Sequence, residues 1–160
     1  MGFKLITEEL ITTMAAAAKN SSRRRSLYTF HEANTDKVHR LLNIIQPDSY
    51  LRPHKHTTPD KVEVVVLLKG ELAVVEFAED GRVMTNIVLS AGQAPYVLEI
   101  EPNTWHTFIA LESDTAVYLV TEGPWYPASH KVLADWSPEE TDIAGAEKYL
   151  AGLRQELMLY

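Results

Sequence analysis

Short apolar runs separated by turn residues characterise the chain from about Val38 onward. Val, Ile, Leu and Tyr dominate these runs, and the breaks fall at residues 47–48, 69–70, 80–81, 91–92 and 102–103. Turn residues at such intervals delimit short strands, and Asp80-Gly81 between two apolar runs predicts a two-residue hairpin. Strands at this spacing are typical of an antiparallel sandwich or jelly roll. We therefore predict an all-β fold for the middle of the chain.

Helical patterns occur at both ends. Residues 7–20 predict a helix, because Thr7 can cap it, acidic residues follow in its first turn and alanines fill its interior. Near the C-terminus, Ser137, Pro138 and Glu140 match a capping box with proline at the first helical position. The apolar stripe of that second helix comprises Ile143, Ala146, Leu150, Leu153 and Leu157. We expect the stripe to pack on the outside of the barrel or on a partner.

The segment 62–68 is apolar on both faces. Its alternate residues are Val62, Val64, Val66 and Leu68 on one side and Glu63, Val65 and Leu67 on the other. A strand with two apolar faces should be buried on both. One face can look into the barrel, whereas the other needs a cover, either the N-terminal helix or a second subunit. This is the main sequence argument for a homodimer.

Composition and length limit the possible classes of protein. The chain has 160 residues and 46% hydrophobic residues, which suits one folded domain with a core. We divide it into a helix and lead-in (1–36), a barrel (37–125) and a C-terminal segment with a helix (126–160). The sequence contains no cysteine, which excludes disulfides, thiolate metal sites and cysteine nucleophiles.

Charge and hydropathy argue against two kinds of partner. A formal net charge of −7 disfavours a nucleic-acid or anionic-membrane surface, and we interpret the basic run 23–25 as a solvated helix end. No apolar stretch reaches the length of a membrane span. Glu8 and Glu9 interrupt the apolar N-terminus, which is unlike a signal peptide, so we expect a cytoplasmic protein.

Four residues form a candidate metal site: His54, His56, Glu63 and His106. Residues i and i+2 of a strand point to the same face, so His54 and His56 can aim two imidazoles at one point. Glu63 lies among valines and leucines, where an unpaired carboxylate is costly. Imidazoles with one carboxylate suit a divalent transition metal, and such an ion would supply the compensating charge.

These residues resemble the two motifs of the cupin superfamily. The first motif is H-x-H, then Glu, then six residues and Gly, which corresponds here to His54, His56, Glu63 and Gly70. The loop 57–61 is longer than usual for the family and looks like an insertion. The second motif, P-x-G-x-x-H, is matched by residues 101–106 and ends at His106. Glu replaces its proline and Asn replaces its glycine, which is a mild change at a left-handed position.

Within that superfamily, the chain more closely resembles one branch, the WbuC-type cupin-fold metalloproteins. It rests on SYLRPHKH (49–56), NTWHTF (103–108), EGPWYPASHKVLADWSPEE (122–140) and the lead-in 23–43. The resemblance implies a jelly-roll (double-stranded β-helix) barrel with flanking helices. It also implies a metal-binding protein of undefined activity, with relatives linked to surface-polysaccharide gene sets.

The ligand set leaves both the metal and the reaction open. Three imidazoles and one carboxylate leave an octahedral ion two open positions, and one Fe, Mn, Ni or Zn ion per chain would satisfy the set. Such an ion can act as a Lewis acid on an oxygen-rich substrate, as in an isomerase, epimerase or lyase. Redox-active iron or manganese could instead activate dioxygen.

Four further residues are candidates for substrate binding. Arg52 shares a strand face with His54 by alternation, and Tyr50 shares the face of Arg52, whereas Lys55 should point away. Phe108 shares the face of His106 and could form the floor of the pocket, whereas Trp105 should pack outside the barrel. The last candidate is His31, from the lead-in.

We expect the remaining histidines, His39 and His130, to be satisfied or exposed polar residues. The leading hypothesis is a metal-dependent enzyme that acts on a polar, sugar-derived small molecule. The alternatives are an iron-dependent dioxygenase, a non-catalytic module that binds a ligand through its metal, and a structural metal site. No catalytic acid or base is assigned, because Glu63 is already used as a metal ligand.

Overall fold

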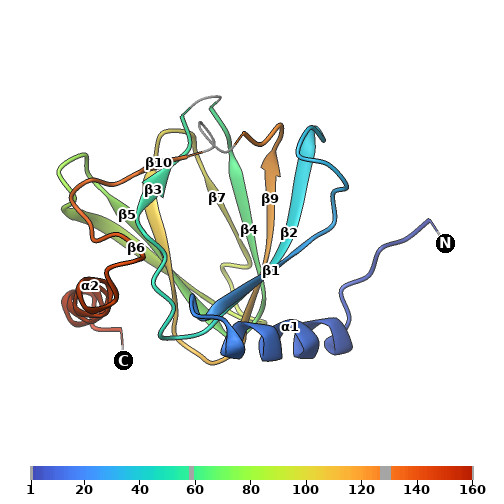
Figure 1. The fold of residues 1–160 in the computed structure, drawn as a ribbon, viewed down its shortest axis with the longest axis horizontal. Helices are drawn as coiled ribbons and strands as arrows, with labels where there is room; N and C mark the ends of the chain where they lie inside the picture. Colours follow the sequence, from blue (N-terminus) through green and yellow to red (C-terminus); the bar gives the residue numbers. More distant parts are fainter. Residues whose placement is uncertain (1, 58–59, 127–130, 160) are drawn as a thin grey trace.

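The computed structural model describes residues 2–57, 60–126 and 131–159. Two five-stranded antiparallel sheets face each other and form a jelly-roll barrel (Figure 1). In spatial order, the first sheet contains β1 (Arg25–Thr29), β2 (Val38–Ile45), β9 (Thr115–Glu122), β4 (Glu63–Lys69) and β7 (Val97–Ile100). The second contains β10 (Val132–Leu133), β3 (His54–Lys55), β8 (Trp105–Ala110), β5 (Glu71–Phe77) and β6 (Val83–Ser90). The predicted all-β architecture is confirmed.

The main core fills the space between the sheets. It consists of inward-facing apolar residues from strands of both sheets, including Ile45, Val65, Leu72, Phe108 and Leu119. Both sheets extend beyond the predicted barrel range of 37–125, because β1 pairs with β2 and β10 pairs with β3. The lead-in and the C-terminal segment therefore contribute edge strands to the barrel.

The hairpin between β5 and β6 forms where Asp80-Gly81 predicts it, but its connection is longer than two residues. The strands end at Phe77 and begin again at Val83, and the Ala78 N–H donates to the Arg82 carbonyl at 2.9 Å. The pairing register shifts at Glu76/Phe77. Gly81 has φ +85°, a conformation that glycine adopts without a steric penalty.

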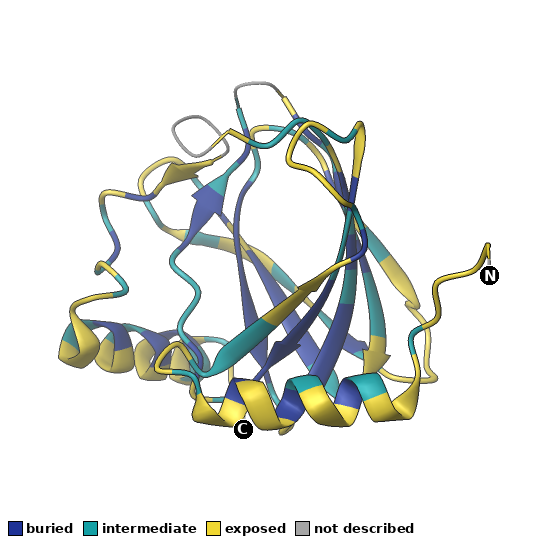
Figure 2. Cartoon of the chain, turned by 45° about the vertical axis from the view of Figure 1, so that its right-hand side comes forward, coloured by how far each residue is buried: buried dark blue, intermediate teal, exposed yellow. Residues whose placement is uncertain are grey.

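The N-terminal helix α1 (Glu8–Asn20) matches its prediction. The Thr7 side chain accepts a hydrogen bond from the Leu10 N–H at 3.2 Å, which is the expected cap. The helix lies against β1 and β2, and it buries Ile11, Ala15 and Ala18 on the side that faces them (Figure 2). Its other side is solvated.

The C-terminal helix α2 (Ile143–Glu156) begins later than predicted. Its N-cap is Asp142, whose side chain accepts a hydrogen bond from the Gly145 N–H at 3.0 Å. Ser137 instead donates to the Ala134 carbonyl, and Glu140 forms ion pairs with arginines of the lead-in. Ser137 and Glu140 therefore make tertiary contacts and do not cap the helix.

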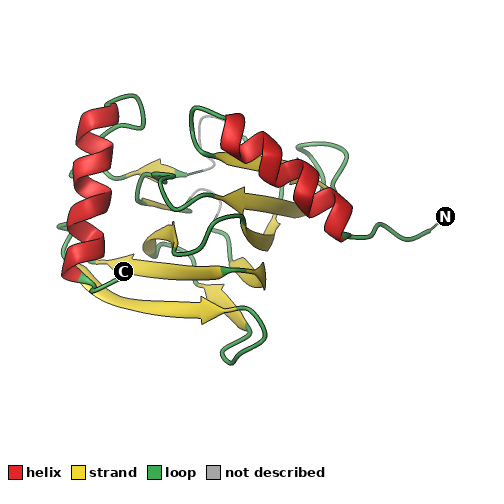
Figure 3. Ribbon diagram, turned by 90° about the horizontal axis from the view of Figure 1, so that it is seen from below, coloured by secondary structure: helices red, strands yellow, loops and turns green. Residues whose placement is uncertain are grey.

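The packing of α2 agrees with one of the two predicted locations. Leu150 and Leu153 pack on the outer face of the second sheet, and Ala146 is also buried, whereas Ile143 is exposed. The view from below shows the two helices at different sides of the barrel (Figure 3). No helix in the described part of the chain is long and apolar enough to cross a membrane.

Strand β4 is less covered than the sequence predicts. Val65 is fully buried in the barrel, but Val64 and Val66 on the outer face are half-buried and Leu68 is 39% exposed. The reason is that α1 lies against β1 and β2 rather than over β4. The outer face of β4 thus keeps accessible apolar surface.

Candidate metal centre

The four predicted metal ligands come together inside the barrel. His54, His56, Glu63 and His106 are all buried, and their ligand atoms lie within 4.8 Å of one another. His54 on β3 pairs directly with His106 on β8 in the second sheet. Glu63 begins β4 in the first sheet. The cluster therefore bridges the two sheets of the jelly roll.

A turn before β8 places two of these ligands next to each other. Asn103 has φ +64°, so it adopts the left-handed conformation that its place in the second motif predicts. The Asn103 N–H donates to the His56 carbonyl at 3.0 Å. This bond joins the segment that carries His56 to the segment that carries His106.

Backbone carbonyls orient two of the imidazole rings. His54 Nδ1 lies 3.0 Å from the Arg52 carbonyl oxygen, and His106 Nδ1 lies 2.9 Å from the Thr104 carbonyl oxygen. A carbonyl oxygen can only accept, so each Nδ1 carries the proton. In the neutral rings the Nε2 atoms then hold free lone pairs, which is the arrangement found in metal-bound histidines.

Two buried polar atoms of the cluster have no hydrogen-bond partner. They are Glu63 Oε2 and His106 Nε2, and they lie 3.2 Å apart, with His56 Nε2 at 3.5 Å from the same carboxylate oxygen. An unsatisfied buried carboxylate destabilises a protein unless positive charge compensates it. A cation between these atoms would satisfy both, so the residues present fit a divalent transition metal.

The protonation states agree with that fit. Burial lowers the pKa of His54 well below its usual range, which favours the neutral imidazole that a metal requires. Burial alone would raise the pKa of the Glu63 carboxyl. Interactions with the adjacent His106 and His56 side chains outweigh burial and hold this pKa well below its usual range. A bound cation would act in the same direction.

The cluster borders a cavity of about 560 Å³, which we call the basic cavity. Its walls include three metal-ligand candidates, a set of apolar side chains and the cations Arg23, Arg25 and Lys131. A neighbouring cavity of about 410 Å³ shares Leu27, Leu41, His56, Glu63 and Trp125 with it. Together they form one ligand-sized space that ends at the metal cluster.

Two of the four predicted substrate-binding residues face this space. Phe108 lines the basic cavity, with its ring centroid 5.7 Å from that of His106. His31 lines the neighbouring cavity and stacks on His39 with 4.0 Å between ring centroids. Burial lowers the pKa of His39, so its imidazole is held neutral. His130 lies outside the described residues.

The other two predicted residues lie elsewhere. Arg52 donates from Nε and Nη2 to the Ala134 carbonyl at 3.0 and 2.7 Å, and the Tyr50 hydroxyl donates to the Pro138 carbonyl at 2.9 Å. The prediction assumed that strand alternation extends back from His54. Strand β3 begins only at His54, so the alternation does not apply to residues 50–52.

The residues flanking the cluster that were expected to face away do so. The Lys55 ammonium pairs with Glu79 at 2.7 Å and lies over the Trp105 ring. Trp105 packs in the core between the second sheet and α2. Both side chains are therefore outside the barrel interior.

Sequence analysis missed the basic wall of the cavity. Arg25 is not in a solvated helix end: it begins β1, and its side chain is only 8% exposed. Arg25, Leu27 and Thr29 share a strand face and line the two cavities. That alternation was visible in the sequence, whereas nothing in the sequence indicated that Lys131 would lie at the same site.

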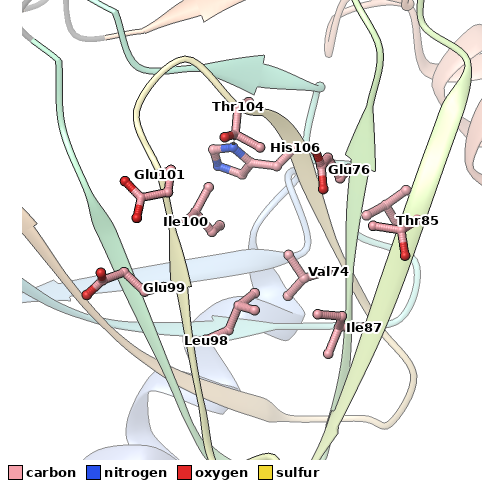
Figure 4. A pocket seen from close by; sticks show the side chains of 11 residues that line it. Val74, Glu76, Thr85, Ile87, Leu98, Glu99, Ile100, Glu101, Thr104 and His106 are labelled. Carbon is pink, nitrogen blue, oxygen red and sulfur yellow. Dashed lines mark hydrogen bonds between the residues drawn. The ribbon is translucent and has the colours of Figure 1, made fainter.

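A smaller hollow of about 250 Å³ has His106 of the cluster in its wall (Figure 4). It lies between strands β5, β6 and β7, at the edge of the two sheets formed by β6 and β7, opposite the edge formed by β1 and β10. Its charged lining among the described residues consists of Glu76, Glu99 and Glu101. We call it the acidic hollow.

Solved structures similar to this chain share its fold. KdgF from Halomonas sp. is 16% identical, with 65% of this chain and 83% of that chain covered and a TM-score of 0.50. CapF from Staphylococcus aureus is 17% identical, with 71% and 32% covered and a TM-score of 0.55. Oxalate decarboxylase from Bacillus subtilis is 18% identical, with 81% and 34% covered and a TM-score of 0.51. The chain spans about a third of the length of the last two.

These likenesses show a cupin jelly roll and, at such low identity, nothing beyond the fold. No curated protein sequence matches the chain. Residues 6–89, which form more than half of the chain, match a family that is described as "Domain of unknown function (DUF6016)". The chain therefore belongs to the DUF6016 family and has the cupin fold.

Proposed function

We propose that this protein binds one divalent transition metal per chain through His54, His56, Glu63 and His106 and acts as a metal-dependent enzyme on a polar, sugar-derived small molecule. The observation that carries the proposal is the buried Glu63 Oε2 facing His106 Nε2 with no hydrogen-bond partner for either atom. The ligand-sized space that begins at this cluster supports a substrate role over a closed structural site.

The metal site and the residues of the cavity wall would have different roles in binding the substrate. A bound metal ion supplies Lewis acidity toward an oxygen atom of the substrate. Phe108 and the neighbouring leucines exclude water from one wall of the cavity. Asn43 and His31 present polar groups at other parts of the wall and can orient hydroxyl groups. These features suit an isomerase, epimerase or lyase on a sugar derivative.

A second candidate function is a non-catalytic module that holds a ligand at its metal. One observation favours it: Glu63 is the only carboxylate among the described residues that line the two connected cavities. A general acid or base would then have to come from a histidine such as His39, whose buried imidazole is held neutral.

The WbuC-type assignment and a link to surface-polysaccharide metabolism are also part of this proposal. They are supported by the sequence stretches 49–56, 103–108 and 122–140. CapF, which shares the fold, is described as a capsular polysaccharide assembling protein. A homodimer is supported by the outer face of β4, where Val64 and Val66 are half-buried and Leu68 is exposed.

The test is the metal content of protein purified without chelator or added metal. Elemental analysis should find about one ion per chain in the wild type and less than about a tenth of that in His56→Ala and His106→Ala. His31→Gln is the matched control, because it alters a histidine of the same space outside the cluster. It should keep the wild-type metal content.

Circular dichroism must show that the Ala variants remain folded. Metal retained by both variants at the wild-type level would refute the assignment of the site. Iron in the wild type, together with oxygen consumption, would favour a dioxygenase over an isomerase. Metal without turnover of any sugar derivative would favour the binding module.

A further inference from the structure

We propose that the ligand of the basic cavity is an anion, with a carboxylate or phosphate group that binds Lys131 while another part of the molecule reaches the metal cluster. This inference deepens the proposed function, because it names the chemical class of the substrate for the same site. It rests on a difference in partners: Arg23 and Arg25 form ion pairs within the protein, whereas the Lys131 ammonium forms none among the described residues.

The arginines already have partners. The Arg25 Nη2 atom lies 2.7 Å from both oxygens of Glu140, and Arg25 Nη1 donates to the Tyr50 carbonyl at 2.9 Å. Arg23 pairs with the same carboxylate at 2.8 Å. Their donors thus join the lead-in to the C-terminal segment and shape the wall, so they are engaged before any ligand arrives.

Lys131 has no such partner among the residues that the structure describes. Among the described residues its ammonium makes no hydrogen bond or ion pair, although it lines the cavity that contains His54, His56 and Glu63. Lys131 therefore shares one cavity wall with the metal cluster, and its donors remain available to a ligand.

The charge of the site also favours an anion. The chain as a whole carries a net charge of −7, yet three cations line the basic cavity against the carboxylate of Glu63. With Glu140 included, one positive charge remains in excess, and a divalent metal would raise the excess to three. Excess positive charge on the wall of a cavity attracts an anionic ligand.

The dimensions are compatible with a ligand that reaches both groups. A volume of about 560 Å³ falls in the usual range for small-molecule pockets and accommodates a monosaccharide acid or phosphate. The apolar side chains Leu27, Leu51 and Phe108 contribute to the same wall. They would contact the carbon skeleton of the ligand, while its anionic group binds Lys131 and its other end reaches the metal cluster.

The experiment compares three probes on the cobalt(II)-loaded protein: D-glucuronate, glucose 6-phosphate and glucose. Isothermal titration calorimetry should show that at least one anion binds more than about ten-fold more tightly than neutral glucose, the gain expected from charge-assisted hydrogen bonds. Preference between glucuronate and glucose 6-phosphate then distinguishes a carboxylate ligand from a phosphate ligand.

Variants test whether Lys131 is the group responsible. Lys131→Met should weaken binding of the preferred anion by about ten-fold and leave glucose binding unchanged, whereas Lys131→Arg should stay within about three-fold of wild type. The control is Lys55→Met, which alters a nearby lysine that faces away and pairs with Glu79. It should bind like the wild type.

Several outcomes would overturn the proposal. These are equal affinity for glucuronate, glucose 6-phosphate and glucose in the wild type, no binding of either anion, or an unchanged anion affinity in Lys131→Met. Cobalt content is measured first, so failure of the metal site is recognised separately. The same titrations on metal-free protein then still compare Lys131→Met with the wild type.

Discussion

The basic cavity and the acidic hollow approach the same cluster from opposite sides, and they differ in charge. Arg23, Arg25 and Lys131 line the first, whereas Glu76, Glu99 and Glu101 line the second. The cavity is also the larger of the two, at about 560 Å³ against about 250 Å³. Only the cavity offers an anionic ligand both space and favourable charge.

The two sites come from different parts of the chain. The acidic hollow is built mainly on barrel strands β5, β6 and β7. The cations of the basic cavity come from the lead-in and from the segment that enters β10. The barrel strands and the turn before β8 therefore position the cluster, while segments at the edges of the sheets determine which ligand can approach it.

Of the changes considered for the two sites, removal of the Glu140 carboxylate should have the largest effect, a loss of folding stability. Glu140→Ala leaves Arg25, which is 8% exposed, without its carboxylate partner. Loss of one partner from such a pair should destabilise the fold by about 2 kcal/mol, equivalent to about 4–8 °C in Tm for a domain of this size. Urea and thermal unfolding provide the measurement.

Glu99→Ala is the matched change on the acidic side. Glu99 is exposed and lines the hollow, so its loss should cost less than about 0.5 kcal/mol. Equal destabilisation by the two variants would contradict the view that Glu140 holds the basic wall together.

Acidification should weaken the ion pairs of Glu140 with Arg25 and Arg23, and it should lower the free energy of unfolding by less than removal of Glu140 does. Burial alone would raise the pKa of Glu140, but the Arg25 and Arg23 charges outweigh it and hold this pKa below its usual range. A depressed pKa means that the stabilisation is present above the unfolded-state value of about 4.3 and is lost as the pH falls through the folded-state value.

Urea unfolding of wild type and Glu140→Gln between about pH 7 and about pH 3 checks this prediction. The difference in free energy of unfolding should be constant near neutrality and should shrink by about 1 kcal/mol or more below about pH 4. A difference that grows on acidification would mean that Glu140 is not stabilised in its ionised form.

The smallest effect is expected from the acidic hollow. The double variant Glu99→Gln, Glu101→Gln should change anion affinity in the basic cavity by less than about two-fold at about 0.15 M salt. At that ionic strength exposed charges are screened beyond about 8 Å. Calorimetry with the preferred anion makes the comparison. A much larger gain in affinity would show that the two sites are electrostatically coupled through the cluster.

Local signals in the sequence were sufficient for part of the fold and for the cluster. Thr7 caps α1 as predicted, because a cap depends on residues a few positions apart. Asn103 takes the left-handed conformation that its motif position requires. His54, His56, Glu63 and His106 converge as the motif spacing indicates.

Failures arose where a residue's neighbours are distant in the chain. The predicted capping box at Ser137 and Glu140 did not form, since Glu140 pairs with arginines more than a hundred residues away. Arg52 and Tyr50 were assigned to the pocket on an alternation that ends at His54.

By itself, the sequence determined the all-β class and the N-terminal helix, because strand patterns and helix caps depend on residues close together in the chain. Its resemblance to the two cupin motifs identified the four candidate ligands. Only the tertiary structure decided that Arg25 and Lys131 lie in the wall of the cavity beside the cluster and that the cavity and the acidic hollow carry opposite charges. The physical reason is that the site is completed by edge strands from both ends of the chain, and their pairing depends on the folded barrel.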